Sequence, residues 1–393
     1  MRRLEDIRFP GKSVFLRVDF NVPLDESAEI RDDTRIRAAL PTIHYLLDEG
    51  ARLVIASHLG RPKGQFNPKL SLKPVAGRLS GLCGQEVRLA PSVVGEEVEA
   101  LKRELKEGQA LLLENVRFHA EETANDAGFA RKLAEGIDVY VNDAFGACHR
   151  AHASVVAIAG LVKEKAAGYL LQKEVEYLNR ATRSPEKPYV AVLGGAKVSD
   201  KIPLIQSLLD KADHVLIGGA MAYTFFRAQG LEVGKSLVEE ELKDQALAIL
   251  EKARESGVDL VLPLDHLLAA AVDKEAPTEV VSSFPFPQDK MAVDIGPRTI
   301  QKYAEIIAGA RTVFWNGPLG VFEVDRFAQG TIQIALAVAS SEAVSIVGGG
   351  DSIAAIEKAG VSDRITHIST GGGASLEYLA LGTLPGIEAL ESD

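Results

Sequence analysis

Residues Tyr189–Lys197 read YVAVLGGAK, an apolar run that ends in two glycines and a lysine. Two more apolar runs in the same half of the chain end in glycines, at Val215–Gly219 and Val344–Asp351. Glycine at the corner between a strand and a helix lets backbone N–H groups approach a ligand, because no Cβ stands in the way. Helix N-termini bind phosphate through such N–H groups. One glycine pair would more often serve tight packing, but three of them favour a polyphosphate site.

Charged side chains accompany two of these corners. Lys197 and Lys201 follow the first corner, and their spacing of four residues predicts that they share one helix face. Asp351 follows the third corner. Two lysines and an aspartate beside the glycines favour a polyphosphate together with its metal ion.

The apolar runs of the first half end in polar and cationic side chains instead. These runs are Val14–Val18, Leu53–Ala56, Leu111–Leu113 and Val139–Val141. Ligands of open α/β sheets bind outside the carboxyl ends of the strands, so parallel pairing would gather the following side chains at one rim. The cations expected there are His58, Arg61, Arg117, Arg150 and His152. In a chain of net charge −11, such a rim predicts a small anionic ligand.

Length and composition predict a soluble protein of two domains. The 393 residues exceed the roughly 250–300 at which a single core stops growing. The acidic balance argues against nucleic acid or an anionic membrane as a partner. Two cysteines, without a C-x-x-C pair, argue against a disulfide framework or a structural zinc site. The start of the chain lacks a signal-peptide pattern and no apolar run reaches about 18 residues, so we expect a cytoplasmic location.

Strand and helix patterns alternate along nearly the whole chain, which is typical of parallel sheets. Expected helices are Thr34–Glu49, Ser71–Leu82, Asp126–Glu135, Gln172–Arg180, Asp200–Lys211, Glu239–Ser256, Arg298–Ala308 and Ser352–Ala359. A polar, proline-bearing stretch after Arg180 predicts the domain boundary there. The expected fold class is α/β, with two doubly wound, Rossmann-like parallel-sheet domains joined by a helix and a hinge-bending cleft.

Two other classes of protein share some of these patterns. A dehydrogenase would also have parallel sheets and glycine corners, but the chain lacks the G-x-G-x-x-G fingerprint and its acidic partner. A hinged binding protein would explain the cationic rim, but not Lys197, Lys201 and Asp351. Gly230–Ser236 is similar to a P-loop but has one residue too few between its glycines.

The chain also resembles a known family, the phosphoglycerate kinases, over nearly its whole length. The motifs that carry this resemblance are RVDFNVP at 17–23, DTRI at 33–36, SHLGRP at 57–62, LENVRF at 113–118, NDAFG at 142–146, HRAH at 149–152, GGAKVSDKI at 194–202, WNGPLGVFE at 315–323, GGGDS at 348–352 and TGGGAS at 370–375. Each motif is a modest match alone, but the ordered series is highly specific.

The resemblance implies a division of the chain into four parts. It implies a 3-phosphoglycerate-binding domain at 1–170 and an interdomain helix and linker at 171–187. A nucleotide-binding domain at 188–370 and a hinge and tail at 371–393, returning to the first domain, would follow. The activity implied is reversible phosphoryl transfer between 1,3-bisphosphoglycerate and ADP-Mg, giving 3-phosphoglycerate and ATP. The resemblance further implies a monomer that uses Mg²⁺ in the form of the Mg-nucleotide complex.

The resemblance also implies the site residues. Those expected to bind 3-phosphoglycerate are Asp19, Asn21, Arg35, His58, Arg61, Arg117 and Arg150. Those expected to bind ATP or ADP are Lys197, Lys201, Asn316, Glu323, Gly349, Gly350, Asp351 and Ser352, with Asp351 also next to the metal. Catalytic roles are expected for Arg35, Lys201, Gly350 and Gly373. A carboxylate acceptor is already ionised at neutral pH, which agrees with the absence of a convincing general base in the sequence.

Overall fold

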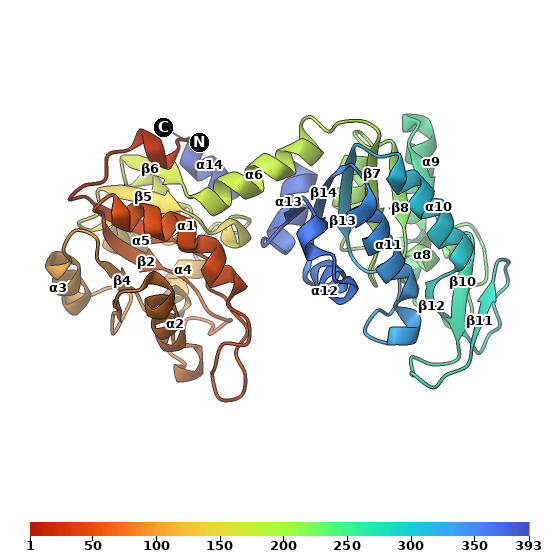
Figure 1. Ribbon diagram of the computed structural model, residues 1–393, viewed down its shortest axis with the longest axis horizontal. Helices are drawn as coiled ribbons and strands as arrows, with labels where there is room; N and C mark the ends of the chain where they lie inside the picture. The colour runs from red at the N-terminus through yellow and green to blue at the C-terminus, as the bar shows by residue number, and fades with distance from the viewer. Residues whose placement is uncertain (393) are drawn as a thin grey trace. The chain divides into compact units, whose positions relative to one another are not determined.

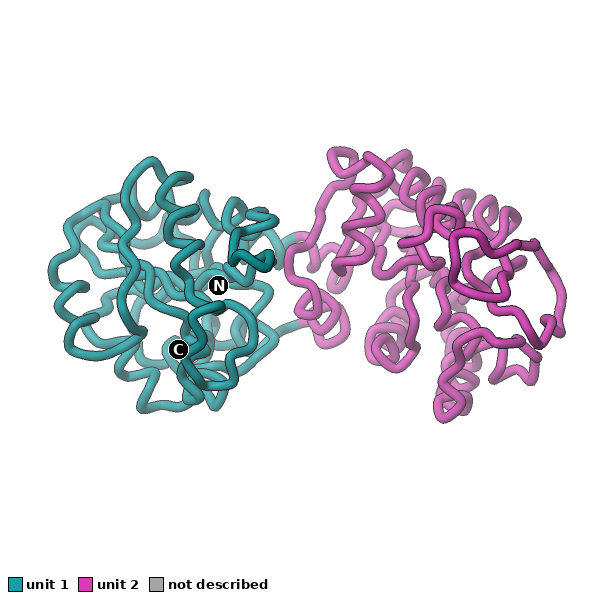
Figure 2. The backbone as a smooth tube through the Cα atoms, turned by 90° about the horizontal axis from the view of Figure 1, so that it is seen from below, with its two compact units in different colours: residues 1–176, 383–393 teal, residues 177–382 magenta. Residues whose placement is uncertain are grey.

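The computed structural model describes residues 1–392 and divides the chain into two compact units. Unit 1 contains Met1–Glu176 and Thr383–Asp393, and unit 2 contains Tyr177–Gly382. Figure 2 colours the two units separately. The division falls within one helix, α6 (Tyr169–Thr182), which begins in unit 1 and ends in unit 2. The α/β class with two doubly wound parallel sheets is confirmed.

Unit 1 is built on a six-stranded parallel sheet of order β3-β4-β2-β1-β5-β6 (Figure 1). Its strands are β1 Ser13–Arg17, β2 Arg52–Ala56, β3 Val87–Leu89, β4 Ala110–Leu112, β5 Val139–Asn142 and β6 Glu164–Ala167. Its helices are α1 Thr34–Asp48, α2 Lys73–Cys83, α3 Glu96–Glu104, α4 Ala120–Thr123, α5 Ala127–Ala134 and α14 Pro385–Glu391, and it shares α6. Short 3₁₀ turns are η1 Leu4–Asp6, η2 Pro68–Leu70, η3 Val116–Phe118, η4 Phe145–Ala147 and η5 Ala157–Gly160.

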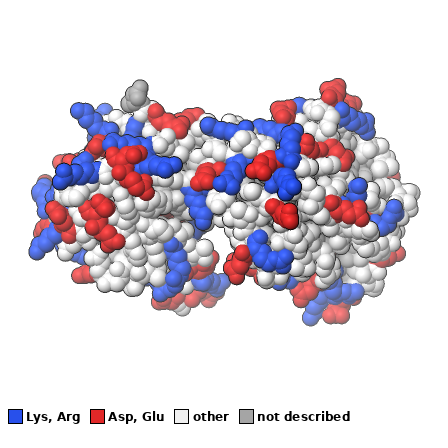
Figure 3. Space-filling model, turned by 45° about the horizontal axis from the view of Figure 1, so that its top comes forward, with Lys and Arg blue, Asp and Glu red and all other residues white. Residues whose placement is uncertain are grey.

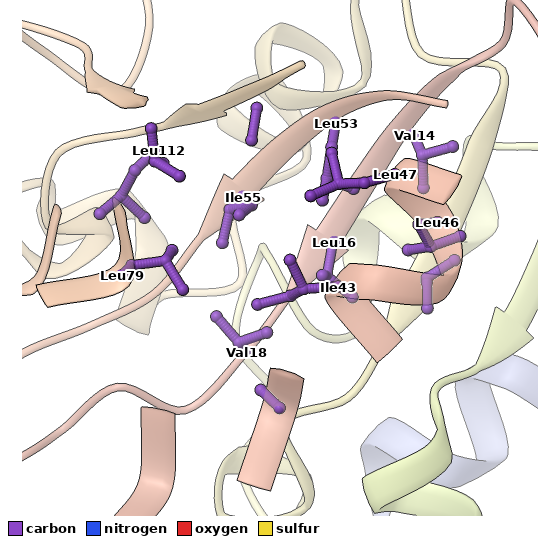
Figure 4. Close-up of a cluster of buried hydrophobic side chains, with 14 of the residues drawn as sticks. Val14, Leu16, Val18, Ile43, Leu46, Leu47, Leu53, Ile55, Leu79 and Leu112 are labelled. Carbon is purple, nitrogen blue, oxygen red and sulfur yellow. The ribbon is translucent and has the colours of Figure 1, made fainter. Parts of the chain in front are cut away.

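The largest apolar cluster of unit 1 lies between one face of the sheet and the helices that cover it. Leu16 and Ile55 are register partners on β1 and β2, and both point toward Ile43 of α1 (Figure 4). All three side chains are fully buried. Side chains alternate between the two faces of a strand, so Arg17 faces the opposite side of the sheet from Leu16. Arg17 is also fully buried, and its partners are described below.

Unit 2 contains a second six-stranded parallel sheet of order β15-β14-β13-β7-β8-β9. Its strands are β7 Tyr189–Leu193, β8 His214–Ile217, β9 Asp259–Val261, β13 Thr312–Asn316, β14 Val344–Gly348 and β15 His367–Ile368. Its helices are α7 Ile202–Leu208, α8 Met221–Ala228, α9 Lys243–Ser256, α10 Pro297–Ala308, α11 Gln329–Ser340, α12 Gly350–Ala359 and α13 Gly373–Leu381. The 3₁₀ turns are η6 Glu240–Leu242, η7 Asp325–Phe327 and η8 Ser362–Arg364.

An additional antiparallel sheet of order β11-β10-β12 lies in unit 2 and was not expected from the sequence. Its strands are β10 His266–Ala269, β11 Thr278–Val281 and β12 Met291–Ile295. Phe284 and Phe286, in the loop between β11 and β12, pack with Tyr223 and Phe226 of α8 around the ring of His266. The strands β10 and β11 are only four residues long, so their alternation in the sequence is a weak signal.

The expected helices are all present, with ends that shift by a few residues. The largest shift is at α9, which begins at Lys243 instead of Glu239, after a separate 3₁₀ turn. Next are α6, which begins at Tyr169 instead of Gln172, and α7, which ends at Leu208 instead of Lys211. The expectation that Lys197 and Lys201 share a helix face is wrong. Residues 194–201 form a loop and a turn, and Lys201 is only the residue that precedes α7.

Among the described residues, none of the helices combines the length and the apolar character that a membrane crossing demands.

Substitution of Gly194 tests how tightly the first glycine corner is packed. A Cβ at this position would lie 2.1 Å from the Pro318 carbonyl oxygen, so Gly194→Ala should lower the stability of unit 2 by about 1–3 kcal/mol. Denaturant unfolding followed by the fluorescence of Trp315, the only tryptophan and fully buried in unit 2, measures this loss. Gly309→Ala is the control, because Gly309 has helical backbone angles and only an ordinary contact at 3.7 Å. Equal unfolding midpoints for both variants would contradict the prediction.

Candidate active site

The side chains predicted to form the anion rim follow the carboxyl ends of the strands of unit 1. Asp19 and Asn21 follow β1, and His58 and Arg61 follow β2. Arg117 lies in η3 after β4, Arg150 follows η4 after β5, and Arg35 is in the first turn of α1. In the strand order, β2, β3 and β4 lie on one side of β1, and β5 and β6 lie on the other. The order in which strands are added to the sheet therefore switches sides at β1. Ligands of doubly wound sheets bind at such a switch point.

Asp19 is the charged centre of this rim, and its side chain is 9% exposed. Its Oδ2 forms an ion pair with Arg35, and its Oδ1 accepts a hydrogen bond from Asn21 N at 3.1 Å. Burial by itself would raise the pKa of Asp19, but His58, the guanidinium groups of Arg35 and Arg17, and the Asn21 N–H outweigh burial and lower it. Asp19 is therefore a carboxylate at neutral pH.

His58 lies beside Asp19, with 3.9 Å between its Nε2 and Asp19 Oδ1. Burial lowers the pKa of His58 well below its usual value, and the cations Arg17, Arg117 and Arg35 lower it further, against the opposing effect of Asp19. His58 is therefore neutral near pH 7. Because His58 is neutral, the cations that stabilise the Asp19 carboxylate are Arg35, which touches it directly, and Arg17.

Arg117 is held by the backbone of the neighbouring loop. Its Nη1 donates to Gly60 O at 2.9 Å, and its backbone N donates to Asn115 Oδ1 at 3.1 Å. Burial lowers the pKa of Arg117 to about 10, with further contributions from Arg17 and Arg150, so it remains a cation at neutral pH. Its Nε is buried without a hydrogen-bond partner, which leaves one donor available for an anionic ligand.

Arg61 and Arg150 are exposed, and Arg150 Nε donates to His149 Nε2 at 3.0 Å.

His152 does not add a cation to the rim, contrary to the interpretation of the sequence. It is buried 3.8 Å from Glu122, and burial, with the nearby arginines, lowers its pKa to about 3. His152 is therefore neutral. Figure 3 shows acidic and basic side chains mixed on the face in view.

The first and third glycine corners of unit 2 line a cavity of about 490 Å³ at the carboxyl ends of β7, β13 and β14. Among the residues that line it are all of the predicted nucleotide-binding residues except Glu323: Lys197, Lys201, Asn316, Gly349, Gly350, Asp351 and Ser352. Gly373, the first residue of α13, also lines the cavity. A second cavity of about 210 Å³ is lined by Glu323, Asp351 and the second glycine corner. A larger cavity in unit 1 is lined by none of the residues predicted to bind a ligand. Two of its lining residues, Asp33 and Arg78, form an ion pair with 2.6 Å between Oδ2 and Nη2.

Asn316 and Ser352 fix the loops of the larger cavity. Asn316 Nδ2 donates to Gly348 O at 2.5 Å, and Ser352 Oγ accepts from Gly317 N at 2.6 Å. The backbone at Gly349 has φ +95°, and a Cβ there would lie 2.5 Å from Asn316 Nδ2, so this corner needs glycine. Asn316 Oδ1 is buried without a hydrogen-bond partner. An unpaired buried acceptor of this kind in a cavity wall indicates a place for a ligand group.

Lys201 and Lys197 differ in their surroundings. Lys197 is exposed, whereas Lys201 is 9% exposed. Burial lowers the pKa of Lys201 to about 8, although Asp200 and Asp351 oppose this shift. Lys201 is therefore mostly protonated at pH 7 and close to its point of titration.

The residues around the cavity fit Mg²⁺ only as an ion that arrives with its nucleotide. No group of three or more His, Cys, Asp or Glu within residues 1–392 could hold a metal ion. Asp351 is an exposed carboxylate that lines both cavities, and the unpaired Asn316 Oδ1 is a second oxygen in the larger one. Mg²⁺ is commonly bound by one or two carboxylates plus substrate phosphates, and this donor set agrees with that pattern.

Reasoning from the sequence missed three residues that support the rim. Arg17, Ser154 and Glu122 are buried and connected by hydrogen bonds behind His58. The available signal was the arginine in the apolar strand SVFLR, because a charge within a central strand needs buried partners. Glu122, in the short helix α4, and Ser154, in the turn before η5, carried no such signal.

Comparisons with known proteins agree with this arrangement. The family model for phosphoglycerate kinase matches residues 4–381. The phosphoglycerate kinase of Koribacter versatilis is 56% identical over 395 residues, covering 98% of each chain, and that of Anaeromyxobacter sp. strain Fw109-5 is 55% identical over 100% of this chain and 99% of its own. Among solved structures, the phosphoglycerate kinase of Coxiella burnetii superposes with a TM-score of 0.91 at 43% identity, covering 99% of this chain and 98% of that one.

Fold, site and similarity together define a two-domain α/β kinase. More narrowly, the chain belongs to the phosphoglycerate kinase family.

The pKa of Lys201 leads to a prediction about nucleotide binding. Lys201 holds its proton below about pH 8 and loses it above, so ADP affinity of the free enzyme should fall above pH 8 by up to about tenfold per pH unit. Lys201→Arg should remove this decline, because guanidinium stays protonated throughout this range. Calorimetric titration between about pH 7 and 9 measures it. The control Lys197→Arg, at the exposed lysine, should keep the decline, and a wild-type affinity that does not change with pH would refute the assignment.

Proposed function

We propose that this protein catalyses the reversible transfer of a phosphoryl group between 1,3-bisphosphoglycerate and ADP, giving 3-phosphoglycerate and ATP. The observation that carries the proposal is a pair of clusters suited to anions, at the strand ends of two separate sheets. One gathers arginines around a carboxylate and an amide, and the other surrounds a cavity with glycine corners and lysines. Family membership supplies the names of the two ligands.

The rim of unit 1 would bind 3-phosphoglycerate. Arg61, Arg117 and Arg150 would contact its phosphate, because the planar guanidinium matches phosphate oxygens. The unpaired Nε–H of Arg117 supports this role. Asp19 and Asn21 would orient the hydroxyl and carboxylate end of the substrate. Asn21 already accepts from Gly60 N at 2.8 Å through its side-chain oxygen, which fixes its orientation.

The cavities of unit 2 would bind the nucleotide. Lys197, Asn316 and the N–H groups at Gly349, Gly350 and Ser352 would contact the phosphates. Glu323 would accept hydrogen bonds from the ribose hydroxyls in the smaller cavity. Asp351 would hold Mg²⁺, which neutralises phosphate charge when it is bound.

The transfer itself would need charge stabilisation rather than a base. The acceptor is a carboxylate, which is ionised at neutral pH, so no proton has to be removed. We propose direct in-line transfer, with Arg35, Lys201 and the backbone N–H groups of Gly350 and Gly373 stabilising the oxygens of the transferring group. Because the two ligands are assigned to different units and reacting atoms must come within about 3–3.5 Å, the units would have to close around them. We also propose that the enzyme acts as a cytoplasmic monomer.

The activity is tested by a coupled assay for ATP-dependent consumption of 3-phosphoglycerate, and Arg35→Ala tests the mechanism. Arg35 is assigned to charge that develops during transfer, so its loss should lower kcat by about 10²–10³ and change substrate binding much less. Arg88→Ala, at an exposed arginine paired with Glu104 in the same unit, is the control and should keep wild-type kcat. Near-normal turnover of Arg35→Ala would disprove its role. No turnover by the wild type would instead favour a binding protein.

Separate variants test the division of labour between the units. Arg150→Ala should weaken binding of 3-phosphoglycerate and leave ADP affinity of the free enzyme nearly unchanged, because each site is built within one unit. Glu323→Ala should have the reverse effect. Losing one charge-assisted hydrogen bond should cost about 1.5–3 kcal/mol of binding, a factor of about 10–150. Calorimetric titration of each variant with each ligand alone gives the answer, and equal losses for both ligands would mean that the sites are assigned wrongly.

A further inference from the structure

Arg17 is a fully buried cation on the central strand of unit 1, and it contacts no solvent. Its Nη1 donates to the Val18 carbonyl oxygen, and its Nε donates to Ser154 Oγ at 2.8 Å. Its Nη2 lies 3.2 Å from Nδ1 of His58. The side chain is thus fixed at each of its three nitrogens, and one of these contacts reaches a residue of the proposed substrate rim.

The contact between Arg17 and His58 determines where the histidine carries its proton. Every guanidinium nitrogen can donate a hydrogen bond and none can accept one. His58 Nδ1 must therefore be the acceptor, so it carries no proton. A neutral ring with an unprotonated Nδ1 has its single N–H at Nε2. This Nε2 is the atom that lies 3.9 Å from Asp19 Oδ1.

The same contact opposes a positive charge on His58. A proton on Nδ1 would remove the hydrogen bond from Arg17 and place two cations 3.2 Å apart. The charged groups that face the ring are Asp19, Arg17, Arg117 and Arg35, so three cations oppose one carboxylate. The direction of the pKa of His58, well below its usual value, agrees with this geometry.

Glu122 is the buried counter-charge of Arg17, and Ser154 connects them. Ser154 Oγ accepts from Arg17 Nε, so its only proton is free to donate to Glu122 Oε1 at 2.6 Å. Ser154 N donates to Glu122 Oε2 at 2.9 Å, and Tyr140 Oη donates to Ser154 O at 3.0 Å. Glu122 is fully buried. Arg17 is therefore connected to Glu122 through Ser154, and it donates directly to His58.

We propose that Arg17 and Glu122 are positioning residues that hold His58 as the neutral Nε2–H tautomer, with this N–H offered to an oxygen of the anionic substrate. The role in substrate binding rests on the proposed function. The tautomer itself does not, because it follows from contacts within the free enzyme. A neutral donor keeps the same hydrogen-bonding state between about pH 5 and 8, where an ordinary histidine would titrate.

The first test uses the unaltered enzyme without substrate. Long-range ¹H–¹⁵N correlation spectra report which nitrogen of each histidine is protonated, and the chain has 8 histidines. The signal that disappears in His58→Asn identifies His58. We expect Nε2–H with an unprotonated Nδ1, unchanged between about pH 5 and 8. A proton on Nδ1, or an imidazolium ring at neutral pH, would overturn the proposal whether or not the enzyme transfers phosphoryl groups.

The second test removes the two buried charges together. Replacing a buried ion pair by groups of similar size is often neutral for stability, so Arg17→Met/Glu122→Gln should fold, as circular dichroism would verify. Burial, Arg117 and Arg35 still lower the pKa of His58 in this variant, but without Arg17 this pKa should rise, so His58 becomes protonated at a higher pH than in the wild type. Its protonated form would attract the anionic substrate. The ratio of the variant's KM for 3-phosphoglycerate to that of the wild type should therefore fall about three- to tenfold from pH 8 to about 5.5.

The phosphate of the substrate also titrates in this pH range, but it affects the KM of both enzymes equally and so does not change the ratio. Arg88→Gln, which removes an exposed arginine of the same unit, is the control, and its ratio should not change with pH. A flat ratio for the double variant, with His58 still in the Nε2–H form, would show that Arg17 and Glu122 do not set its state. Failure of the double variant to fold would show that these residues are needed for stability, and would count against a role limited to positioning.

Discussion

The parallel pairing of central strands is the constraint on which both proposed sites depend. In unit 1, β1 pairs with β2 on one side and β5 on the other, and in unit 2 β7 pairs with β8 and β13. Parallel strands end at the same edge, so segments far apart in the sequence meet there. Asp19 thereby lies beside His58, and Gly194 lies against Pro318. A change that separates the central strands of one unit would remove the whole site of that unit, whereas a change in one loop would alter one ligand contact.

The two units form their sites by different physical means. Unit 1 uses fixed side-chain charges that hold one another in place, such as the Asp19–Arg35 ion pair and the buried Arg17. Unit 2 uses backbone N–H groups that glycine exposes, and positions its loops with neutral contacts such as Ser352 Oγ to Gly317 N. A substrate phosphate at the end of a small molecule suits the first arrangement. A polyphosphate that lies along several loops suits the second.

Much of the fold could be predicted from the sequence because its signals are local. The glycine corner at Gly348–Gly350 and the apolar strand before it are contiguous, and α12 begins at Gly350, two residues before the expected start, and ends at Ala359 as expected. Lys197 and Lys201 were placed wrongly on a helix, since spacing alone cannot distinguish a turn from a helix. The links between Arg17, Ser154 and Glu122 could not be predicted, because they join residues 137 and 32 positions apart in the chain.

Burial lowers the pKa of each of these basic side chains, but it leaves the arginine and lysine charged and the histidines neutral. It lowers the pKa of Arg117 to about 10 and that of Lys201 to about 8, yet both remain largely protonated at neutral pH because their ordinary values are so high. The ordinary pKa of histidine is near 6.5, so the same desolvation leaves His58 and His152 neutral. Arg117, His58 and His152 therefore keep their protonation states near neutral pH, whereas Lys201 begins to lose its proton as the pH approaches 8. This matches a transfer to a carboxylate, in which no residue has to gain or lose a proton.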